Sequence, residues 1–375
     1  MIERMSEARV HGGRIGRFLR EFTAGVTTRD LKRLFDRDAA NAYRVLTRER
    51  AAQEPSGRIR RWLYRAKIVF LGLSFKLTPA RRVLFGVALL AALLGAVKVN
   101  VVMEGKNVTI DFSPLWFLVS IGLLVFLLAL ELVDRVLVRD ELEVARQLQR
   151  DLLPTAAPDL AGYRIAHSYR TANEVGGDYY DFLPLADGRT AFIIGDASGH
   201  GMAAGLLMAI ANAALKLAVE VDPTPARVAE LLNRVLCRTG GRHAFMSLFY
   251  GVLSPAEGRL DYVCAGHPFP LLRRADGGIG ELGTGGLPLG IKQDLTHSPS
   301  SVTLQPGDLL VMFSDGLPEA AGPGGEGLGY DTLRDLLTVP GTAQEIHDRL
   351  MTALESHRRE EPLKDDLSIV VVARV

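Results

Sequence analysis

The chain has almost no cysteine, since only Cys237 and Cys264 occur among its 375 residues. Two cysteines cannot build a disulfide framework, and no Cys/His spacing typical of a zinc site is present. Both lie in apolar stretches, which favours free, buried thiols in a reducing compartment. Neither stands in a Cys-x5-Arg loop, so the sequence gives no signature of a covalent cysteine intermediate.

The chain also has little net charge, but its formal charge of +1 is the balance of two unequal parts. Met1–Arg82 holds 20 Lys and Arg against 8 Asp and Glu, a net charge of +12, and the remainder has a net charge of −11. This asymmetry indicates a basic segment beside a membrane or a nucleic acid, followed by an acidic domain. No helix-turn-helix or aromatic-interleaved pattern supports nucleic-acid binding, so contact with anionic lipid is favoured.

Long apolar runs are present, in contrast to these absences. One extends from Val83 to about Met103 with Lys98 as its only charge, and Phe112–Leu130 has no charge at all. A membrane span needs about 20 such residues. The alternative is a pair of buried helices in a soluble core, but such helices seldom hold 19 uncharged, mostly large apolar residues. We therefore predict two transmembrane helices with a short loop over residues 83–132.

Charge predicts the orientation of this region. Arg81 and Arg82 precede the first span, and Arg135 and Arg139 follow the second. The positive-inside rule then places both ends in the cytoplasm, as expected of a multi-pass protein of the cell membrane. Residues 1–82, with apolar side chains at helical spacing within Asp30–Arg50, are interpreted as a basic cytoplasmic helical segment without the apolar run of a signal peptide.

Residues 133–155 predict a linker helix that continues from the second span. Apolar residues recur at intervals of three and four, and the pattern stops at Pro154. This spacing is typical of a short coiled coil, which would give a homodimer seam. It is equally typical of an amphipathic helix that packs on its own domain, so the oligomeric state stays open.

Residues 156–375 alternate short apolar strands with a few helices, and Gly or Pro stands at nearly every junction. This pattern predicts an α+β layered sandwich with many antiparallel strands. The expected helices are Met202–Val219 and Pro225–Arg238, and the expected strands are Tyr163–Arg170, Thr190–Ile194, Phe245–Leu253, Arg259–Ala265, Pro270–Arg274, Asp308–Phe313 and Ser368–Val375.

Four acidic positions stand at strand ends, three of them directly beside glycine: Asp178 in EVGGDYYD, Asp196 in FIIGDASGHG, Asp315 in LLVMFSDGL, and Asp365 or Asp366 in KDDLSIVVV. Each alone is typical of an ordinary turn. Carboxylates gathered at strand ends without Cys or His clusters favour hard cations such as Mg²⁺ or Mn²⁺. The four together therefore indicate a candidate metal site.

From Arg146 to Val375 the chain resembles the SpoIIE-like, RsbU-like branch of the metal-dependent protein phosphatases, the PPM family. The resemblance is carried by an ordered series of motifs and begins at Arg146, so nothing before that residue takes part. The motifs are ARQLQRDLLP, EVGGDYYD, GDASGHGMAAGLLM, FMSLFYGVL, LDYVCAGHPFPLL, GLPLGI, LQPGDLLVMFSDGLPEA and DDLSIVVV.

The resemblance implies an αββα sandwich of two antiparallel sheets flanked by helices, with a binuclear site for Mn²⁺ or Mg²⁺. Asp196 would bridge both metals, with the carbonyl of Ala197 beside it. Asp178 would bind one metal directly or through water, and Asp315 and Asp365 would hold the other. Asp365 fits the family pattern better than its neighbour.

Such a pair of metals would activate a water for attack on a phosphate ester. The resemblance implies a protein substrate carrying phosphoserine or phosphothreonine, typically an anti-anti-sigma factor of the STAS type. His200 and His267 are candidates for the leaving-group acid, although both also suit structural turn residues. Arg170 is the arginine nearest the first aspartate, and the sequence offers no clearer phosphate-binding arginine.

Two rival functions remain open at this point. A catalytically silent, phosphatase-like membrane scaffold would bind a signalling partner without hydrolysis, but the presence of all four aspartates favours catalysis. A nucleotidyl cyclase or phosphodiesterase would need a base-recognition pattern or His/Asp clusters, and neither is found in the sequence.

Overall fold

The structure is a computed structural model that describes residues 57, 60, 64, 70, 74, 76–97, 99–103, 106–110, 112–239 and 244–375. It contains two compact units, Met1–Arg135 and Val136–Val375. Most of the basic segment 1–82, including the helical pattern in Asp30–Arg50, lies outside the described residues. Its expected helices therefore stay a prediction.

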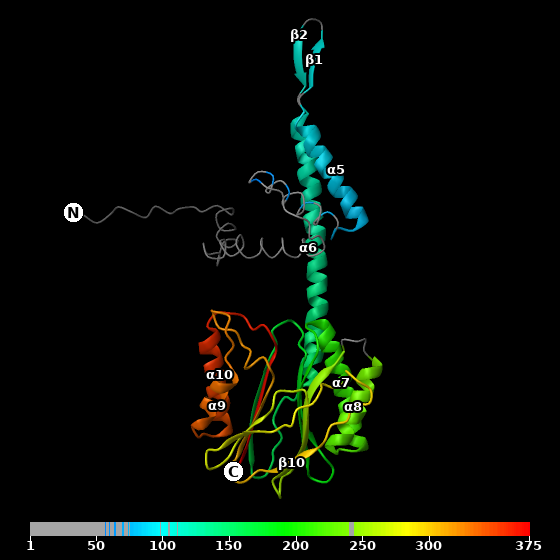
Figure 1. Ribbon diagram of the computed structural model, residues 1–375. Helices are drawn as coiled ribbons and strands as arrows, with labels where there is room; N and C mark the ends of the chain where they lie inside the picture. Colours follow the sequence, from blue (N-terminus) through cyan, green and yellow to red (C-terminus); the bar gives the residue numbers. More distant parts are fainter. Residues whose placement is uncertain are drawn as a thin grey trace, which may run out of the picture. The chain divides into compact units, whose positions relative to one another are not determined.

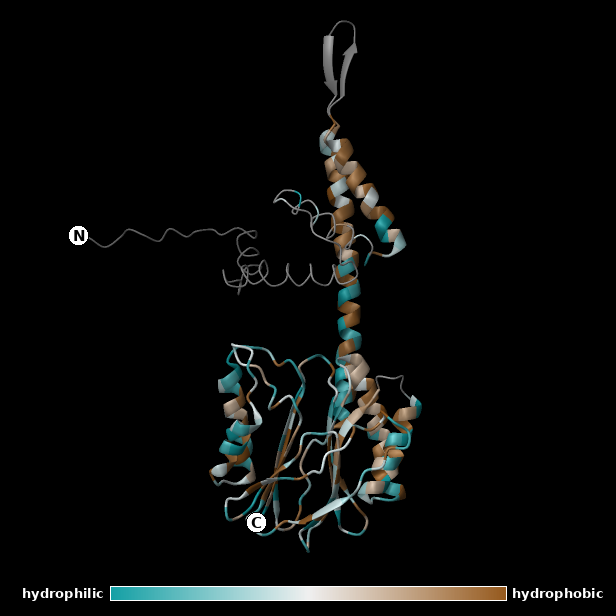
Figure 2. Ribbon diagram, in the orientation of Figure 1, coloured by the Kyte–Doolittle hydropathy of each residue, from teal (hydrophilic) through white to brown (hydrophobic). Residues whose placement is uncertain are grey.

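The first unit contains a helical hairpin. The Ser120 hydroxyl donates to the carbonyl of Ala88 over 2.8 Å, and Arg81 Nη1 lies 2.6 Å from Asp134 Oδ2. Because the later residue of α5 meets the earlier residue of α6, the two helices run antiparallel. Figure 2 shows that both are hydrophobic where they meet. The elements are α5 (Pro79–Gly95), α6 (Ser113–Leu152), β1 (Val99–Met103) and β2 (Lys106–Ile110).

The first predicted span is wrong in its second half, because α5 ends at Gly95 and Val99–Met103 forms strand β1. This strand pairs antiparallel with β2, with Val101 opposite Val108. Valine is β-branched and favours strands, and the run after Gly95 contains four valines within six residues (VKVNVV). Helix α5 has 17 residues and is about 25 Å long, slightly less than the roughly 30 Å of a hydrocarbon core.

Two described helices are long and apolar enough to cross a membrane, α6 and α7 (Met202–Val221). They differ in burial: 11% of the most apolar window of α6 is buried, against 50% for α7. One face of helix α7 is buried in the core of the second unit, and its other face is exposed. Helix α6 runs without a break from Ser113 to Leu152, as the linker pattern predicted.

The second unit consists of two five-stranded sheets with helices outside them (Figure 1). Every strand pair is antiparallel, which confirms the predicted αββα sandwich. The first sheet has the order β10-β7-β6-β5-β4 and is covered by α7 and α8. The second has the order β3-β12-β11-β8-β9 and is covered by α9 and α10.

The bounds of these elements are β3 (Tyr163–Arg170), β4 (Asp178–Pro184), β5 (Thr190–Ala197), α8 (Pro225–Thr239), β6 (Met246–Ser254), β7 (Arg259–Ala265), β8 (Leu271–Arg273), β9 (Ile279–Glu281), β10 (Ser300–Thr303), β11 (Leu309–Phe313), α9 (Tyr330–Thr338), α10 (Ala343–Arg358) and β12 (Leu367–Arg374). The predicted strands at β3 and β7 have these bounds. Five elements of this unit were missed, namely β4, β9, β10, α9 and α10.

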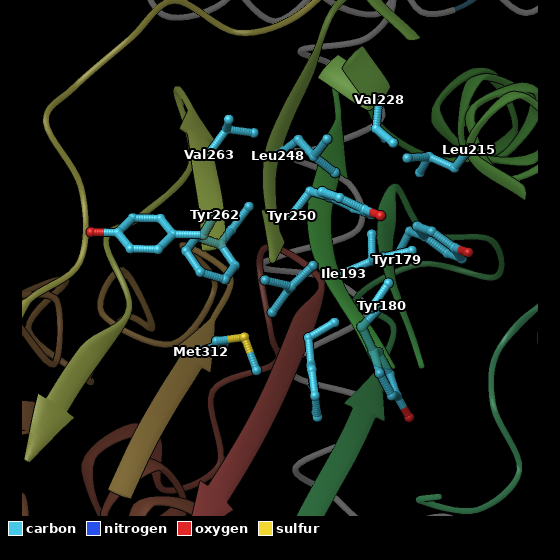
Figure 3. Packing of buried hydrophobic residues seen from close by; sticks show 14 of the residues in the cluster. Tyr179, Tyr180, Ile193, Leu215, Val228, Leu248, Tyr250, Tyr262, Val263 and Met312 are labelled. Carbon is cyan, nitrogen blue, oxygen red and sulfur yellow. The ribbon is translucent and has the colours of Figure 1, made fainter. Parts of the chain in front are cut away.

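The alternation of side chains along β4 and β5 divides the core into two layers. Tyr179 points toward α7 and α8, where Figure 3 shows it on the side of Leu215 and Val228. Tyr180 points the other way, toward the second sheet, where its hydroxyl lies 2.8 Å from His167 Nδ1 of β3. Residues of even number on β4, beginning with Asp178, therefore face the space between the sheets.

The two cysteines are free, as the sequence predicted. Cys264 on β7 is buried, whereas Cys237 near the end of α8 is only half-buried, so the expected burial is wrong for Cys237. Its apolar neighbours belong to a helix with one solvent-facing side.

Candidate metal centre

Asp178 and Asp196 lie directly opposite each other on neighbouring strands. Strand β4 begins at Asp178, and the antiparallel register places Asp196 of β5 beside it. Cross-strand partners share one face of a sheet, so both carboxylates face the second sheet. Asp178 is 1% exposed, and Asp196 is half-buried. The β4–β5 hairpin therefore brings together two acidic groups that are 18 residues apart in the sequence.

The second sheet contributes its carboxylates from the ends of β11 and β12. Ser368 of β12 donates a hydrogen bond from its hydroxyl to Asp178 Oδ2 over 2.8 Å. The backbone N–H of Ser368 donates in turn to the hydroxyl of Ser314, one residue before Asp315. These buried hydroxyls join the two sheets at the level of the aspartates and bring Asp315 to the same end of the sandwich.

The adjacent residues Asp365 and Asp366 have different environments. The Asp366 side chain is 5% exposed and accepts hydrogen bonds from the backbone N–H groups of Ala172, at 2.8 Å, and Gly177, at 2.6 Å. Asp365 is exposed, and its Oδ1 accepts only a local bond from the backbone N–H of Asp366 within the described residues. Asp366 therefore braces the loop before Asp178, while Asp365 keeps a carboxylate oxygen available.

Glycine is required where this loop approaches β5. The Gly177 carbonyl accepts a hydrogen bond from the Ala197 backbone N–H over 3.1 Å. A Cβ atom on Gly177 would lie 2.6 Å from the Ala197 carbonyl oxygen and 2.8 Å from Asp196 Oδ1, closer than real Cβ contacts. Only a residue without a side chain allows the backbone to come this near to the two carboxylates.

The aspartates raise one another's pKa. Burial, followed by the charges of Asp315, Asp365 and Asp366, raises the pKa of Asp196 to about 8. Burial and the charge of Asp196 raise the pKa of Asp178 well above its ordinary value, despite the serine hydrogen bonds. Burial and the charge of Asp365 raise the pKa of Asp315 to about 6. Neighbouring carboxylates resist being ionised together, unless a bound cation neutralises their charge.

The donor set suits a hard divalent cation. Every candidate ligand is a carboxylate or carbonyl oxygen, and Asp315 Oδ1 is buried without a hydrogen-bond partner among the described residues. Among the same residues, however, no three His, Cys, Asp or Glu side chains converge closely enough to form a ligand shell. The strand register nevertheless places Asp178 beside Asp196, and hydrogen bonds from Ser368 to Asp178 and to Ser314 link this pair to the end of β11. The site therefore fits a cation by its chemistry, and the assignment of individual ligands stays a prediction.

The other residues singled out in the sequence lie elsewhere. Arg170 forms an ion pair with Glu355 of α10, so it is already engaged in the second sheet's helix layer. His267 is 3% exposed, its Nδ1 lies 2.9 Å from the Ser247 hydroxyl, and burial lowers its pKa to about 3. His200 is exposed in the turn before α7. Of these three, His267 behaves as a structural histidine.

Several residues of the site were missed in the sequence. Ser314 and Ser368 stand beside the predicted aspartates, and their proximity in FSDG and DDLS was an available signal, whereas Asp366 had been named as the alternative to Asp365. Tyr169 has a buried hydroxyl without a partner among the described residues, and burial together with the charge of Asp366 raises its pKa far above the usual range. Gln149 of α6 contacts the loop before Asp178. Gln149 lies within the motif ARQLQRDLLP, but the motif gave no indication of its role, and no local pattern marked Tyr169.

Comparisons with known proteins agree on the second unit. The profile of the family described as Stage II sporulation protein E (SpoIIE) matches residues 186–375. Protein IcfG of Synechocystis sp. is 28% identical over 264 residues, which cover 63% of this chain and 42% of that protein. Phosphoserine phosphatase RsbU of Bacillus subtilis is 29% identical over 240 residues, covering 63% of this chain and 71% of RsbU. The chain thus spans less than half the length of IcfG.

Solved structures share the fold. The SiaA-PP2C domain of Pseudomonas aeruginosa superposes with a TM-score of 0.57 at 23% identity, covering 64% of this chain and 98% of that domain. The RsbU and RsbW domains of a Mycobacterium tuberculosis protein give a TM-score of 0.51 at 28% identity, covering 60% of this chain and 63% of the other. The two sheets and their flanking helices are therefore those of a PP2C-type domain.

Proposed function

The chain belongs to the SpoIIE family, in the SpoIIE-like, RsbU-like branch of the metal-dependent protein phosphatases, and from this premise we propose that it is a membrane-anchored phosphatase that hydrolyses phosphoserine or phosphothreonine on a regulatory protein. The observation that carries the proposal is the pairing of Asp178 with Asp196 across β4 and β5, together with the Ser368–Asp178 hydrogen bond that joins the second sheet to this pair.

Two divalent cations, Mn²⁺ or Mg²⁺, are the proposed cofactors. Asp196 would hold both, with the Ala197 carbonyl available as a further ligand. Asp178 would hold one directly or through water, and Asp315 and Asp365 would hold the other. When bound, such cations lower the pKa of water and neutralise phosphoryl oxygens. The unpartnered Asp315 Oδ1 and the raised pKa values of the carboxylates support this assignment.

The chain's own residues keep these oxygens in position. Ser368 holds one oxygen of Asp178 by a 2.8 Å hydrogen bond, so that carboxylate cannot rotate freely. The glycine at 177 lets the backbone approach Asp196. Cys264 is buried, and burial raises its pKa to about 11, so it is a poor nucleophile. These features favour attack by a water over a covalent intermediate on a protein side chain.

The proposed substrate is a phosphorylated protein, in particular an anti-anti-sigma factor of the STAS type. The relative named phosphoserine phosphatase RsbU, 29% identical over 240 residues, supports a phosphoserine substrate. Arg170, the arginine that precedes Asp178 most closely in the sequence, is paired with Glu355 and so is engaged away from a phosphate. Recognition would then rest on the cations and on the surface of the partner protein.

The α5–α6 hairpin is the proposed membrane anchor. Large apolar side chains on both helices are solvent-exposed, including Val83 at 69%, Leu93 at 65% and Leu118 at 69%. Apolar exposure that continues along two helices is unfavourable in water and suits contact with lipid. The proposed location is the cell membrane, with the phosphatase domain in the cytoplasm. The part of α6 that follows the apolar run, residues 133–152, is the proposed seam of a homodimer through its apolar positions at intervals of three and four.

The proposal is tested by assaying the purified full-length chain for Mn²⁺-dependent hydrolysis of p-nitrophenyl phosphate and of a phosphoserine peptide. The expected result is hydrolysis that EDTA abolishes and that Asp196→Asn reduces at least 10³-fold, an order of magnitude typical for loss of a metal-bridging group. Binding of a partner without any hydrolysis would support a silent scaffold instead. Comparison of the phosphoproteome with and without Asp196→Asn would then identify the substrate.

A further inference from the structure

The last turns of α6 end against the loop that leads to Asp178. The Gln149 side chain is 5% exposed and makes two hydrogen bonds with one residue of this loop. Its Nε2 donates to the Gly176 carbonyl over 2.5 Å, and its Oε1 accepts from the Gly176 N–H over 2.9 Å. A side-chain amide that satisfies both backbone groups of one glycine replaces the pairing that a neighbouring strand would give.

The same loop is confined on its other sides. A Cβ atom on Gly176 would lie 2.5 Å from Asp366 Oδ2 and 2.6 Å from the Tyr169 hydroxyl. The neighbouring Gly177 donates its N–H to Asp366 and accepts from the Ala197 N–H. The loop is therefore held by α6 on one side and by the two sheets on the other, and the next residue is Asp178.

Gln149 is the stronger of two contacts from α6 to this loop. One turn earlier, Arg146 Nη1 lies 3.6 Å from Glu174 Oε2, with the glutamate side chain 54% exposed. Exposed pairs of this length contribute little. Loss of the Gln149 amide, in contrast, would leave the N–H and C=O of Gly176 without their partners in a buried place, which is costly and would let the loop move.

We propose that Gln149 is a positioning residue for the metal centre, which fixes the Gly176–Gly177 backbone so that Asp178 stands opposite Asp196. This inference rests on the proposed function, because it assigns Gln149 to the support of the same site. Gln149 lies outside the residues that the family profile matches, 186–375, and so does Asp178. The final turns of α6 are then part of the catalytic unit as well as a linker.

The test is the variant Gln149→Met, which keeps the length and volume of the side chain and removes both hydrogen bonds. Its matched control is Gln147→Met on the same helix, because Gln147 is exposed and bonds only to Asp151 of α6 among the described residues. Mn²⁺ affinity of the purified full-length chains is measured by isothermal titration calorimetry. Amide hydrogen exchange at residues 175–178 is measured without metal.

Gln149→Met is expected to weaken Mn²⁺ binding 10- to 100-fold, as loss of an outer-shell contact typically does. Exchange at residues 175–178 should become at least tenfold faster, while kcat at saturating Mn²⁺ changes less than the affinity does. Gln147→Met should match the wild-type chain in all three. A merely structural role would lower the thermal stability without this difference between metal affinity and kcat.

Mn²⁺ affinity and exchange in Gln149→Met within twofold of the Gln147→Met control would overturn this inference and leave the proposed function intact. A wild-type chain that binds no Mn²⁺ would overturn both. Binding with a Gln149 effect but without phosphoester hydrolysis would overturn only the proposed function. If Gln149→Met does not fold, Gln149→Glu is used, which keeps the acceptor for the Gly176 N–H and removes the donor, and the same weakening is expected.

Discussion

Asp365 and Asp366 are neighbours in the chain, yet their side chains differ in burial and partners. Asp366 accepts two backbone N–H groups in a buried place, so its amide analogue would turn an NH₂ group toward a donor. We expect Asp366→Asn to lower the free energy of unfolding by about 1–3 kcal/mol. We expect Asp365→Asn to leave stability nearly unchanged and to weaken Mn²⁺ binding at least tenfold.

Thermal melts in EDTA and Mn²⁺ titrations of both variants measure these two effects. Each variant is the control of the other, because the two substitutions remove the same charge one residue apart. The reverse pattern, with the larger loss of affinity in Asp366→Asn and the larger loss of stability in Asp365→Asn, would show that Asp366 is the ligand.

The raised pKa of Asp196 predicts that the stability of the metal-free protein depends on pH. Its pKa in the folded chain is about 8, well above its ordinary value, so the folded state binds more protons than the unfolded state. The stability that this proton provides is complete at low pH and is lost as the pH rises through 8. Between pH 6.5 and 8.5 the loss should be about 2 kcal/mol, and Mn²⁺ should suppress it.

Thermal melts in EDTA across this window compare the wild-type chain with Asp196→Asn, which should show a flatter dependence on pH. The buried His267, with a pKa of about 3, is neutral in the folded state across this window and partly protonated in the unfolded state near pH 6.5. Because it contributes equally to both proteins, it does not obscure the difference between them. Equal slopes in the two proteins would mean that the proton is held elsewhere in the cluster.

Among single residues, the sequence identified those that stand in a recognisable local motif. Asp178, Asp196 and Asp315 each stand beside glycine at a strand end. The structure places Asp178 opposite Asp196, and Asp315 follows Ser314, whose hydroxyl is bonded to Ser368 beside Asp178. Gln149 and Tyr169 gave no such signal, because what they do depends on chain segments that meet only after folding. The assignment of each aspartate as a ligand stays a prediction.

Helix α10 illustrates how a local motif stabilises an element that covers a sheet. Thr342 accepts a hydrogen bond from the Glu345 N–H, and the Glu345 side chain accepts one from the Thr342 N–H, which is a capping box. We expect Thr342→Ala to cost about 1 kcal/mol of stability, or roughly 2–4 °C in Tm. Mn²⁺-dependent hydrolysis should persist, because the helix packs on the outer face of β3 and β12.

The matched control is Thr352→Ala within the same helix, where the threonine hydroxyl only bonds back to the Asp348 carbonyl. Alanine has the higher helix propensity there, so its Tm should be unchanged or slightly higher. A Tm for Thr342→Ala equal to that of the control would mean that the cap contributes nothing to the stability of the unit.

Elements with a strong periodic pattern could be predicted, and those formed by context could not. Strands β3 and β7 carry their own apolar runs and were predicted with the observed bounds. Strand β4 was missed because DYYDFLP places two acids in a run that is buried only by packing on both sides. The helix predicted from the first apolar run was wrong after Gly95, because the valines there favour a strand that pairs with β2 over a continued helix.

On the scale of the whole molecule, the chain joins an apolar helical hairpin to a domain of the SpoIIE family. Helices α6 and α7 both pass the test of length and hydropathy for a membrane span, but only α7 has half of its apolar window buried by its own domain. A membrane anchor should therefore depend on α6 and not on α7. This difference gives a comparison within one chain.

We expect the full-length chain to sediment with cell membranes after a high-salt wash. The double variant Leu118→Arg, Val125→Arg in α6 should move it to the soluble fraction or to degradation, since each arginine costs about 3 kcal/mol at the centre of a span. Leu217→Arg in α7, at a side chain 63% exposed, should leave the distribution unchanged. Sedimentation of all three proteins alike would remove α6 as the anchor, because burial in the membrane is what makes a charge on this helix costly.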